Sequence, residues 1–244
     1  MKVTVKQEIG AGACDPNGRL SLLGALTLVE DAVTATLDKM GINGIKMRRE
    51  HGALVVFSKN HLQFLKSIHW QDLVTVACFV SAKSLVRLSV DVCVKNQQGE
   101  IAMYARTEIC AVDAENGRIR RLDTVGISDD LKVYAPLHTM EWTPLDNAEQ
   151  LLETVKVRTA NIDYAGHTNN VEYVRLLLNT FTLEEWRGGI VPREVQIVYA
   201  SQSFLGDDLA IYCTNRDCAG AHPHERLYTI KKQDQDVLRC TLRW

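Results

Sequence analysis

One short pattern occurs twice in this chain, each time just before an apolar run. Asp15-Pro-Asn-Gly18 precedes the run over 20–40, and Asp163-Tyr-Ala-Gly166 precedes the run over 171–181. Aspartate followed three residues later by glycine is typical of a tight turn, because aspartate bonds nearby backbone and glycine adopts conformations closed to other residues. Each copy opens a similar order of elements, so we expect two related halves.

The first apolar run has the spacing of one helix face, and Gly41 is a suitable stop after it. Its apolar positions are Leu22, Leu23, Leu26, Val29, Val33, Leu37 and Met40. We expect a strand over 3–9 before this helix and four strands after it, over 53–65, 73–82, 84–95 and 100–113. Apolar and polar residues alternate in 84–95, which predicts an antiparallel strand with one buried face.

The second half repeats this order with a shorter helix over 171–181. The predicted strands are 154–162 before it and 193–203, 208–215, 226–232 and 236–244 after it. Residues 123–150 are polar, contain two prolines and predict a connector with little core. One helix wrapped by an antiparallel sheet, twice over, predicts an α+β fold of two tandem hot-dog domains, 1–122 and 151–244.

Composition narrows the functional classes. The 244 residues are enough for one large domain or two of about 120 each. A 46% hydrophobic and 24% charged composition is that of a globular protein, and a net charge of −2 gives no basic field for nucleic acid. No apolar stretch approaches the roughly 20 residues of a membrane span, and the N-terminus lacks the apolar segment of a signal peptide.

The seven cysteines are scattered and none forms a CxxC pair. Cys213 and Cys218, with His222 and His224 beyond them, leave zinc as a minor alternative to a hairpin tip. Reduced thiols in a cytoplasmic protein are the expected state.

The second copy of the repeated turn contains the candidate site. Asn161-Ile-Asp-Tyr-Ala-Gly-His167-Thr-Asn-Asn170 lies where a predicted strand gives way to a helix. Backbone N–H groups at a helix start are unpaired and carry partial positive charge, so they can polarise a carbonyl group. Asp163 and His167 lie within a few residues of these donors. This arrangement suits hydrolysis of an activated acyl group.

Each of these side chains also has a simpler interpretation. Asp163 is either a base that activates water or a turn residue that bonds its own backbone. His167 either orients water, shuttles a proton or bonds the carbonyl, or is an exposed histidine on a first helical turn. Gly166 would let substrate approach the backbone. Asn169 and Asn170 would bind substrate or cap the helix, and capping is favoured.

The motif and the double layout resemble the acyl-acyl carrier protein (acyl-ACP) thioesterases of plants and bacteria. The likeness covers nearly the whole chain. It is carried by Asp163, Gly166, His167, Asn169, Asn170 and Tyr173, by the segments 55–59, 117–122 and 195–199, and by Asp15 with the following helix. The resemblance implies hydrolysis of fatty acyl thioesters, with acyl-ACP favoured, releasing free fatty acid in fatty acid biosynthesis. It implies no cofactor and no metal.

This chain departs from the family pattern at three positions. The family's fuller sequence pattern looks like Asp-x-Asn-x-His, with a glutamate and often a cysteine on a facing strand. Ala165 stands in place of that asparagine, and Gln202 and Ser203 stand in place of the other two residues. A glutamine can orient water through its amide but cannot take its proton. The predicted site therefore has Asp163, His167 and Gln202 as catalytic residues and Gly166, Asn169, Asn170 and Ser203 as substrate-binding residues.

The first half has Arg19 where His167 stands in the second, so Asp15 predicts a degenerate counterpart of the site. That half would supply the acyl tunnel, lined by Leu22, Leu26, Val29 and Val33, unless these residues serve only core packing.

Two basic clusters are candidates for docking an acidic acyl carrier protein: Lys46, Arg48 and Arg49, and Arg118, Arg120 and Arg121. Three alternatives stay open at this point. An acyl-CoA thioesterase would use the same chemistry, and Ala165, Gln202 and Ser203 favour a non-catalytic acyl-binding protein. A hot-dog hydratase is disfavoured. The pattern of that class looks like an aspartate followed five residues later by a histidine, whereas His167 lies four residues after Asp163. This chain could also assemble as a homodimer of double hot-dog chains.

Overall fold

A computed structural model describes residues 1–217 and 224–244. The first half contains β1 (Lys2–Glu8), α1 (Leu22–Lys39), α2 (Gly44–His51), β2 (Ala53–Phe64), β3 (Leu73–Lys83), β4 (Arg87–Lys95), β5 (Ile101–Asp113) and β6 (Ile119–Arg120). The second contains β7 (Gln150–Lys156), α3 (Asn170–Leu178), α4 (Leu183–Gly188), β8 (Glu194–Tyr199), β9 (Asp208–Asp217), β10 (His224–Lys232) and β11 (Gln235–Arg243). Within these described ranges, no helix is both long and apolar enough to cross a membrane.

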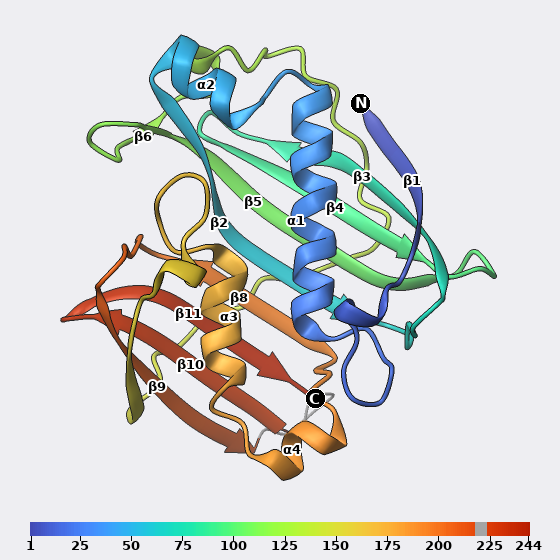
Figure 1. Cartoon of the computed structure of the whole chain (residues 1–244). Helices are drawn as coiled ribbons and strands as arrows, with labels where there is room; N and C mark the ends of the chain where they lie inside the picture. The colour runs from blue at the N-terminus through green and yellow to red at the C-terminus, as the bar shows by residue number, and fades with distance from the viewer. Residues whose placement is uncertain (218–223) are drawn as a thin grey trace.

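The strands form one antiparallel sheet that runs through both halves. Its order is β1-β3-β4-β5-β2-β8-β11-β10-β9-β7, with β6 beside β5. The halves meet where β2 pairs with β8, and Asn60 lies opposite Ile197 in that register. From this junction outward each half has the same strand arrangement, and each has one principal helix on the same face of the sheet (Figure 1). This confirms the predicted α+β tandem hot-dog fold; the domain boundaries remain a prediction.

Helix α1 begins and packs as its sequence pattern predicts. The Ser21 side chain accepts a hydrogen bond from the Gly24 amide and caps the first turn. The four residues suggested as tunnel lining, Leu22, Leu26, Val29 and Val33, are at most 1% exposed and belong to the main core. Burying a side chain of this size stabilises the fold by about 1.5–3 kcal/mol. Core packing is therefore present at these positions, and their role as tunnel lining remains a prediction.

Several predicted boundaries were wrong, because the chain turns and these elements end earlier than predicted. Strand β7 stops at Lys156, and the chain then turns through a short 3-10 helix at Thr159–Asn161. Helix α3 stops at Leu178, and Thr182 starts the separate helix α4 through a reciprocal cap with Glu185. Strand β8 stops at Tyr199, so Gln202 and Ser203 lie in the loop beyond it rather than in a strand.

Helix α2 was not predicted, because it is mostly polar and short. Its capping residues were visible in the sequence: the Asn43 side chain accepts from two amides at the start, and Gly52 adopts a left-handed conformation at the end.

The connector contributes more to the core than its composition predicts. Val125, Ile127, Met140, Leu145 and Ala148 are all buried. Met140 packs with residues of β3, β4 and β5 in a second, smaller cluster on the outer face of the sheet. Burial there requires a second layer, which the connector supplies.

For the same reason β4 is buried on both faces rather than on one. Asp91, expected on the polar face, is 0% exposed. Its carboxylate accepts hydrogen bonds from Tyr104 at 2.6 Å and Ser81 at 2.7 Å, and it pairs with Arg106 at 2.7 Å. These partners make the burial of the charge tolerable.

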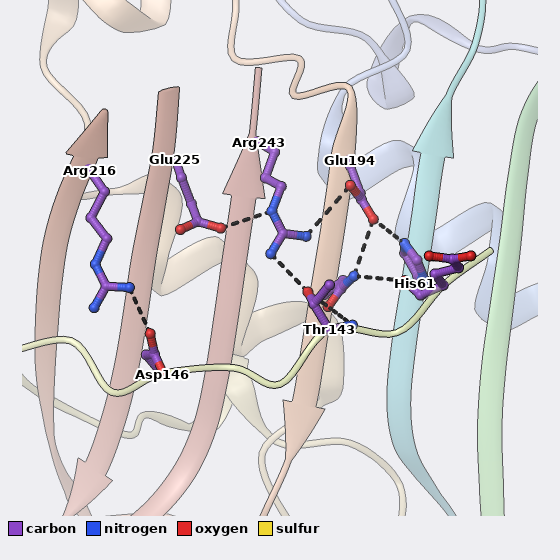
Figure 2. Close-up of polar contacts among 9 residues, drawn as sticks. His61, Thr143, Asp146, Glu194, Arg216, Glu225 and Arg243 are labelled. Atoms are coloured by element: carbon purple, nitrogen blue, oxygen red, sulfur yellow. Dashed lines mark hydrogen bonds and ion pairs between the residues drawn. The ribbon is translucent and has the colours of Figure 1, made fainter. Parts of the chain in front are cut away.

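A polar network fastens the connector to the outer face of the sheet (Figure 2). At its centre, Arg243 of β11 donates to Glu225 of β10 at 2.8 Å and to the Thr143 hydroxyl of the connector at 2.9 Å. Arg243 also contacts Glu194 of β8 at 3.5 Å, and Glu194 hydrogen-bonds His61 of β2 at 2.5 Å. The network thus joins four neighbouring strands, from both halves, to the connector.

The Glu194 carboxyl is the most strongly perturbed group of this network. Burial on its own would raise its pKa. The hydrogen bond and charge of His61, the Gln196 amide and the Arg243 charge outweigh burial and hold the pKa at about 2. A carboxyl with a lower pKa in the folded than in the unfolded chain stabilises the fold fully above its ordinary pKa of about 4.3. That contribution is lost as the pH falls towards about 2.

We expect the free energy of unfolding to fall as the pH drops below about 4.3, and Glu194→Gln to reduce this dependence. At neutral pH the variant should be less stable by about 3 kcal/mol, because His61 loses its carboxylate partner and Arg243 keeps only that of Glu225. Urea unfolding at several pH values measures both effects. The exposed Glu115→Gln is the matched control, and an identical acid dependence in the two variants would contradict the role of Glu194.

Candidate active site

The second copy of the repeated turn, residues 162–169, forms a closed loop between β7 and α3. The Asp163 amide donates to the His167 carbonyl at 3.0 Å, and the Gly166 amide donates to the Asp163 carbonyl at 3.1 Å. Gly166 has a φ of +88°, a left-handed conformation that favours glycine. Asp163 Oδ1 accepts from the Ala165 amide at 2.8 Å. The predicted turn role of Asp163 is therefore present.

The other Asp163 oxygen faces the imidazole of His167. The distance from Oδ2 to Nδ1 is 3.3 Å, and the side chains are 18% and 21% exposed. Nδ1 also hydrogen-bonds the Thr168 carbonyl at 3.4 Å, so a proton on Nδ1 faces both oxygens and leaves the lone pair of Nε2 to accept a proton or to orient water. One carboxylate thus both closes the turn and fixes the histidine.

The two asparagines after His167 have different positions. Asn169 is the N-cap of α3, and its side-chain oxygen accepts from the Val171 amide at 2.8 Å, so the predicted capping role is confirmed. Asn170 is the first helical residue, and its side chain lies near the carboxyl of Glu30 on α1, whose pKa it lowers. Asn170 therefore links the second half to the first.

Ser203 and Gln202 occupy contrasting environments. The Ser203 side chain is 0% exposed, and its hydroxyl bonds the Thr168 hydroxyl at 2.7 Å and the Tyr173 hydroxyl at 2.8 Å. The Thr168 amide donates to the Ser203 carbonyl at 2.9 Å. Ser203 thus ties the loop after β8 to the start of α3. Gln202 is exposed, and its backbone carbonyl accepts from Lys232. The catalytic and binding roles of these two residues remain predictions.

Glu30 is the residue at this site that the sequence interpretation missed. It lies on α1 four residues after Leu26 and three before Val33, on the buried face of the helix. A glutamate within an apolar stripe was the available signal. Burial, together with the charges of Asp31 and Asp163, raises its pKa to about 7, although the Asn170 hydrogen bond acts in the opposite direction.

Two central strands add polar groups next to Glu30. The Asn60 amide of β2 donates to the Tyr199 hydroxyl of β8 at 3.3 Å, and the Thr107 hydroxyl donates to the Asn60 oxygen at 2.7 Å. Burial and the nearby charge of Glu30 raise the pKa of Tyr199 well above its ordinary value. The candidate site therefore draws on α1, β2, β8 and α3, and so on both halves.

The first-half turn reproduces the geometry of the Asp163 loop. The Asp15 amide donates to the Arg19 carbonyl at 2.7 Å, and the Gly18 amide donates to the Asp15 carbonyl at 3.0 Å. In place of the histidine, Arg19 pairs with Asp15 at 3.1 Å and also donates to the Gly188 carbonyl at the end of α4. A cleft of about 670 Å³ lies beside Arg19, and none of its lining residues belongs to the Asp163 loop.

Only two of the four residues suggested as zinc ligands lie within the described part of the chain. Cys213 is buried in β9, and His224 contacts Asp217 at 2.9 Å. Cys218 and His222 lie outside the described residues.

The sequence profiles of two consecutive domains match this chain. The acyl-ACP thioesterase N-terminal domain matches residues 2–127, and the acyl-ACP thioesterase C-terminal domain matches residues 145–244. No curated protein sequence matches the chain.

Solved structures agree with this fold over the full length. An acyl-ACP thioesterase from Bacteroides thetaiotaomicron is 15% identical, with a TM-score of 0.79 over 99% of this chain and 97% of that one. A putative oleoyl thioesterase from Lactobacillus plantarum is 16% identical, with a TM-score of 0.85 over 100% and 96%. The 12:0-ACP thioesterase from Umbellularia californica is 17% identical, with a TM-score of 0.80 over 100% and 93%. At these identities the likeness supports the fold alone.

The double hot-dog fold and the two matching domain profiles together define the class as a thioester hydrolase. Because the two domain profiles cover nearly the whole chain, it belongs to the acyl-ACP thioesterase family, enzymes that hydrolyse fatty acyl thioesters.

The contact between Arg19 and α4 leads to a prediction at Gly189. A Cβ atom there would lie 1.7 Å from Arg19 Nη2 and 2.7 Å from Asp15 Oδ2, and the φ of +84° disfavours any side chain. We expect Gly189→Ala to lower the free energy of unfolding by about 1–3 kcal/mol. A Cβ on the neighbouring Gly188 meets no atom within 4 Å, so Gly188→Ala should be nearly neutral. Chemical denaturation compares them, and equal losses would refute the packing argument.

Proposed function

We propose that this chain hydrolyses fatty acyl thioesters of acyl carrier protein and that Asp163 and His167 position and activate the water. The observation that carries this proposal is the contact between Asp163 Oδ2 and His167 Nδ1 at the start of α3, in a chain of the acyl-ACP thioesterase family. The pair is partly exposed, so substrate can reach it.

In this proposal the thioester carbonyl lies against the backbone near Gly166 and His167. The amides of Thr168, Asn169 and Val171 already donate to Ser203, Asn161 and the Asn169 side chain, so the amides of His167 and Asn170 are the remaining donors at this turn. Water held by His167 Nε2 attacks the carbonyl carbon and forms a tetrahedral intermediate, whose negative oxygen the helix start stabilises. The carbon–sulfur bond then breaks, and free fatty acid and the carrier thiol leave.

The two basic clusters form one docking face, defined as Lys46, Arg48, Arg49, Arg118, Arg120 and Arg121. They adjoin because the Arg120 guanidinium donates to the His51 carbonyl at the end of α2 at 2.6 Å. The face also borders the Asp163 loop, since a Cβ on Gly44 would lie 3.1 Å from the Tyr164 hydroxyl. Ile45, Ile119 and Tyr164 are exposed beside these charges. Positive charge around exposed apolar groups suits an acidic protein partner.

An acyl-CoA substrate is the main alternative, because it needs the same chemistry and no protein docking. Assays of thiol release from medium- and long-chain thioesters of acyl carrier protein and of CoA distinguish the two. The cytoplasmic location and the homodimer remain predictions from the sequence.

Loss of the Asp163 carboxylate should reduce turnover far more than loss of its first-half counterpart. We expect Asp163→Asn to lower kcat/KM by about a hundredfold or more, since His167 loses the group that fixes its tautomer. Asp15→Asn is the matched control, because Asp15 pairs with an arginine that cannot act as a base. Steady-state assays on folded protein measure both. Equal losses would mean that both halves contribute chemistry.

Charge reversal on the docking face should weaken use of the protein-bound substrate. We expect Arg48→Glu combined with Arg118→Glu, both exposed, to lower kcat/KM for acyl carrier protein substrates by about tenfold or more at low salt. The loss should shrink as salt screens the charges, and acyl-CoA turnover should change little.

Lys2→Glu combined with Lys6→Glu is the control for this experiment. Both lysines are exposed on the edge strand β1, which β3 and β4 separate from β5 and β2. If the control pair reduces turnover as much, or if both substrates respond alike, the docking face is not the carrier site.

A further inference from the structure

Glu30 is half-buried, and its carboxyl has incomplete hydrogen bonding. Its Oε1 atom has no hydrogen-bond partner among the described residues, although it is inaccessible to solvent. Leaving such a group unpaired costs folding free energy, more so when it is charged. The other carboxylates of the interior are better provided for: Asp91 has three partners, and Glu194 is held by His61, Gln196 and Arg243. Stability does not explain Glu30.

The groups that interact with Glu30 come from α1, β8, α3 and the site loop. The Asn170 side chain at the start of α3 lies near the Glu30 carboxyl, and the charges of Asp31 on α1 and Asp163 on the site loop both act on it. The Tyr199 hydroxyl of β8 lies close enough to be perturbed by its charge. Glu30 therefore belongs to the first half, and its carboxyl lies near the start of α3 in the second half.

We propose that Glu30 is the proton acceptor for the attacking water in the Asp163 site. This inference rests on the proposed hydrolase function and assigns one of its steps. His167 holds the water through Nε2, and the water oxygen forms its bond to the carbonyl carbon as a proton passes to Glu30 Oε1. The carbon–sulfur bond then breaks, and the departing sulfur takes the proton back from Glu30. Atoms and charge balance without any other reactant.

The chemistry of the neighbouring groups favours Glu30 for this step. Asp163 has one oxygen committed to the Ala165 amide and the other to His167. Gln202 is exposed, and an amide cannot accept the proton in a stable form. A carboxyl with a pKa of about 7 is well matched to proton transfer near neutral pH, because it is both partly ionised and appreciably basic.

The test compares Glu30→Gln with Asp31→Asn, which makes the same chemical change one residue along α1. We expect Glu30→Gln to lower kcat by about a hundredfold on medium- and long-chain acyl carrier protein thioesters, with KM little changed. Its melting temperature should be equal to or higher than that of wild type at pH 8, because an unpaired buried charge is removed. A merely structural glutamate would give the opposite result in stability.

The pH profile supplies a second readout. Wild-type kcat/KM should fall as the pH drops below about 7, where Glu30 becomes protonated, and this limb should be absent from the residual activity of Glu30→Gln. Asp31 raises the pKa of Glu30, so Asp31→Asn should move the limb to lower pH while leaving the plateau unchanged.

The outcomes separate this inference from the function on which it rests. Wild-type protein that releases no thiol from carrier or CoA thioesters would overturn the hydrolase proposal itself. Active wild-type protein with a folded Glu30→Gln variant within about threefold of its kcat would overturn only the role of Glu30. An acid limb that persists in Glu30→Gln would assign the titration to another group and also overturn it.

Discussion

The antiparallel pairing of β2 with β8 is the contact on which the rest of the arrangement depends. It joins the six strands of the first half and the five strands of the second into one sheet, so α1 and α3 lie side by side on the same face. Asn60 of β2 and Tyr199 of β8 meet at this junction through a hydrogen bond, close to the start of α3. A site that uses residues of both halves can exist only because these strands pair.

The repeated turn has one backbone geometry but a different role in each half. The same hydrogen bonds close the loops at Asp15 and at Asp163. Arg19 completes the first loop with a permanent charge and a contact to α4, which makes that loop a packing element. His167 completes the second with an imidazole, which can both accept and donate a proton. One side chain thus separates a structural turn from a candidate catalytic one.

Buried charge is used in two ways in this protein. On the outer face, Asp91 and Glu194 are paired and hydrogen-bonded, and the Glu194 network attaches the connector across four strands. Between the helices, Glu30 keeps one oxygen without a partner. The first arrangement lowers the cost of burial, whereas the second retains that cost and keeps a basic oxygen beside the site loop.

The sequence by itself determined the tandem fold, the two turns, helix α1 and the position of Asp163 and His167, because these depend on local spacing and periodicity. It did not determine that the connector covers β4, since burial of Asp91 and Cys93 comes from a layer distant in sequence. It also placed Gln202 on a strand, although β8 ends at Tyr199. Glu30 was visible as a charge in an apolar stripe. Only the tertiary structure decided that this charge meets Asn170 and Asp163, because that meeting depends on how α1 packs beside α3.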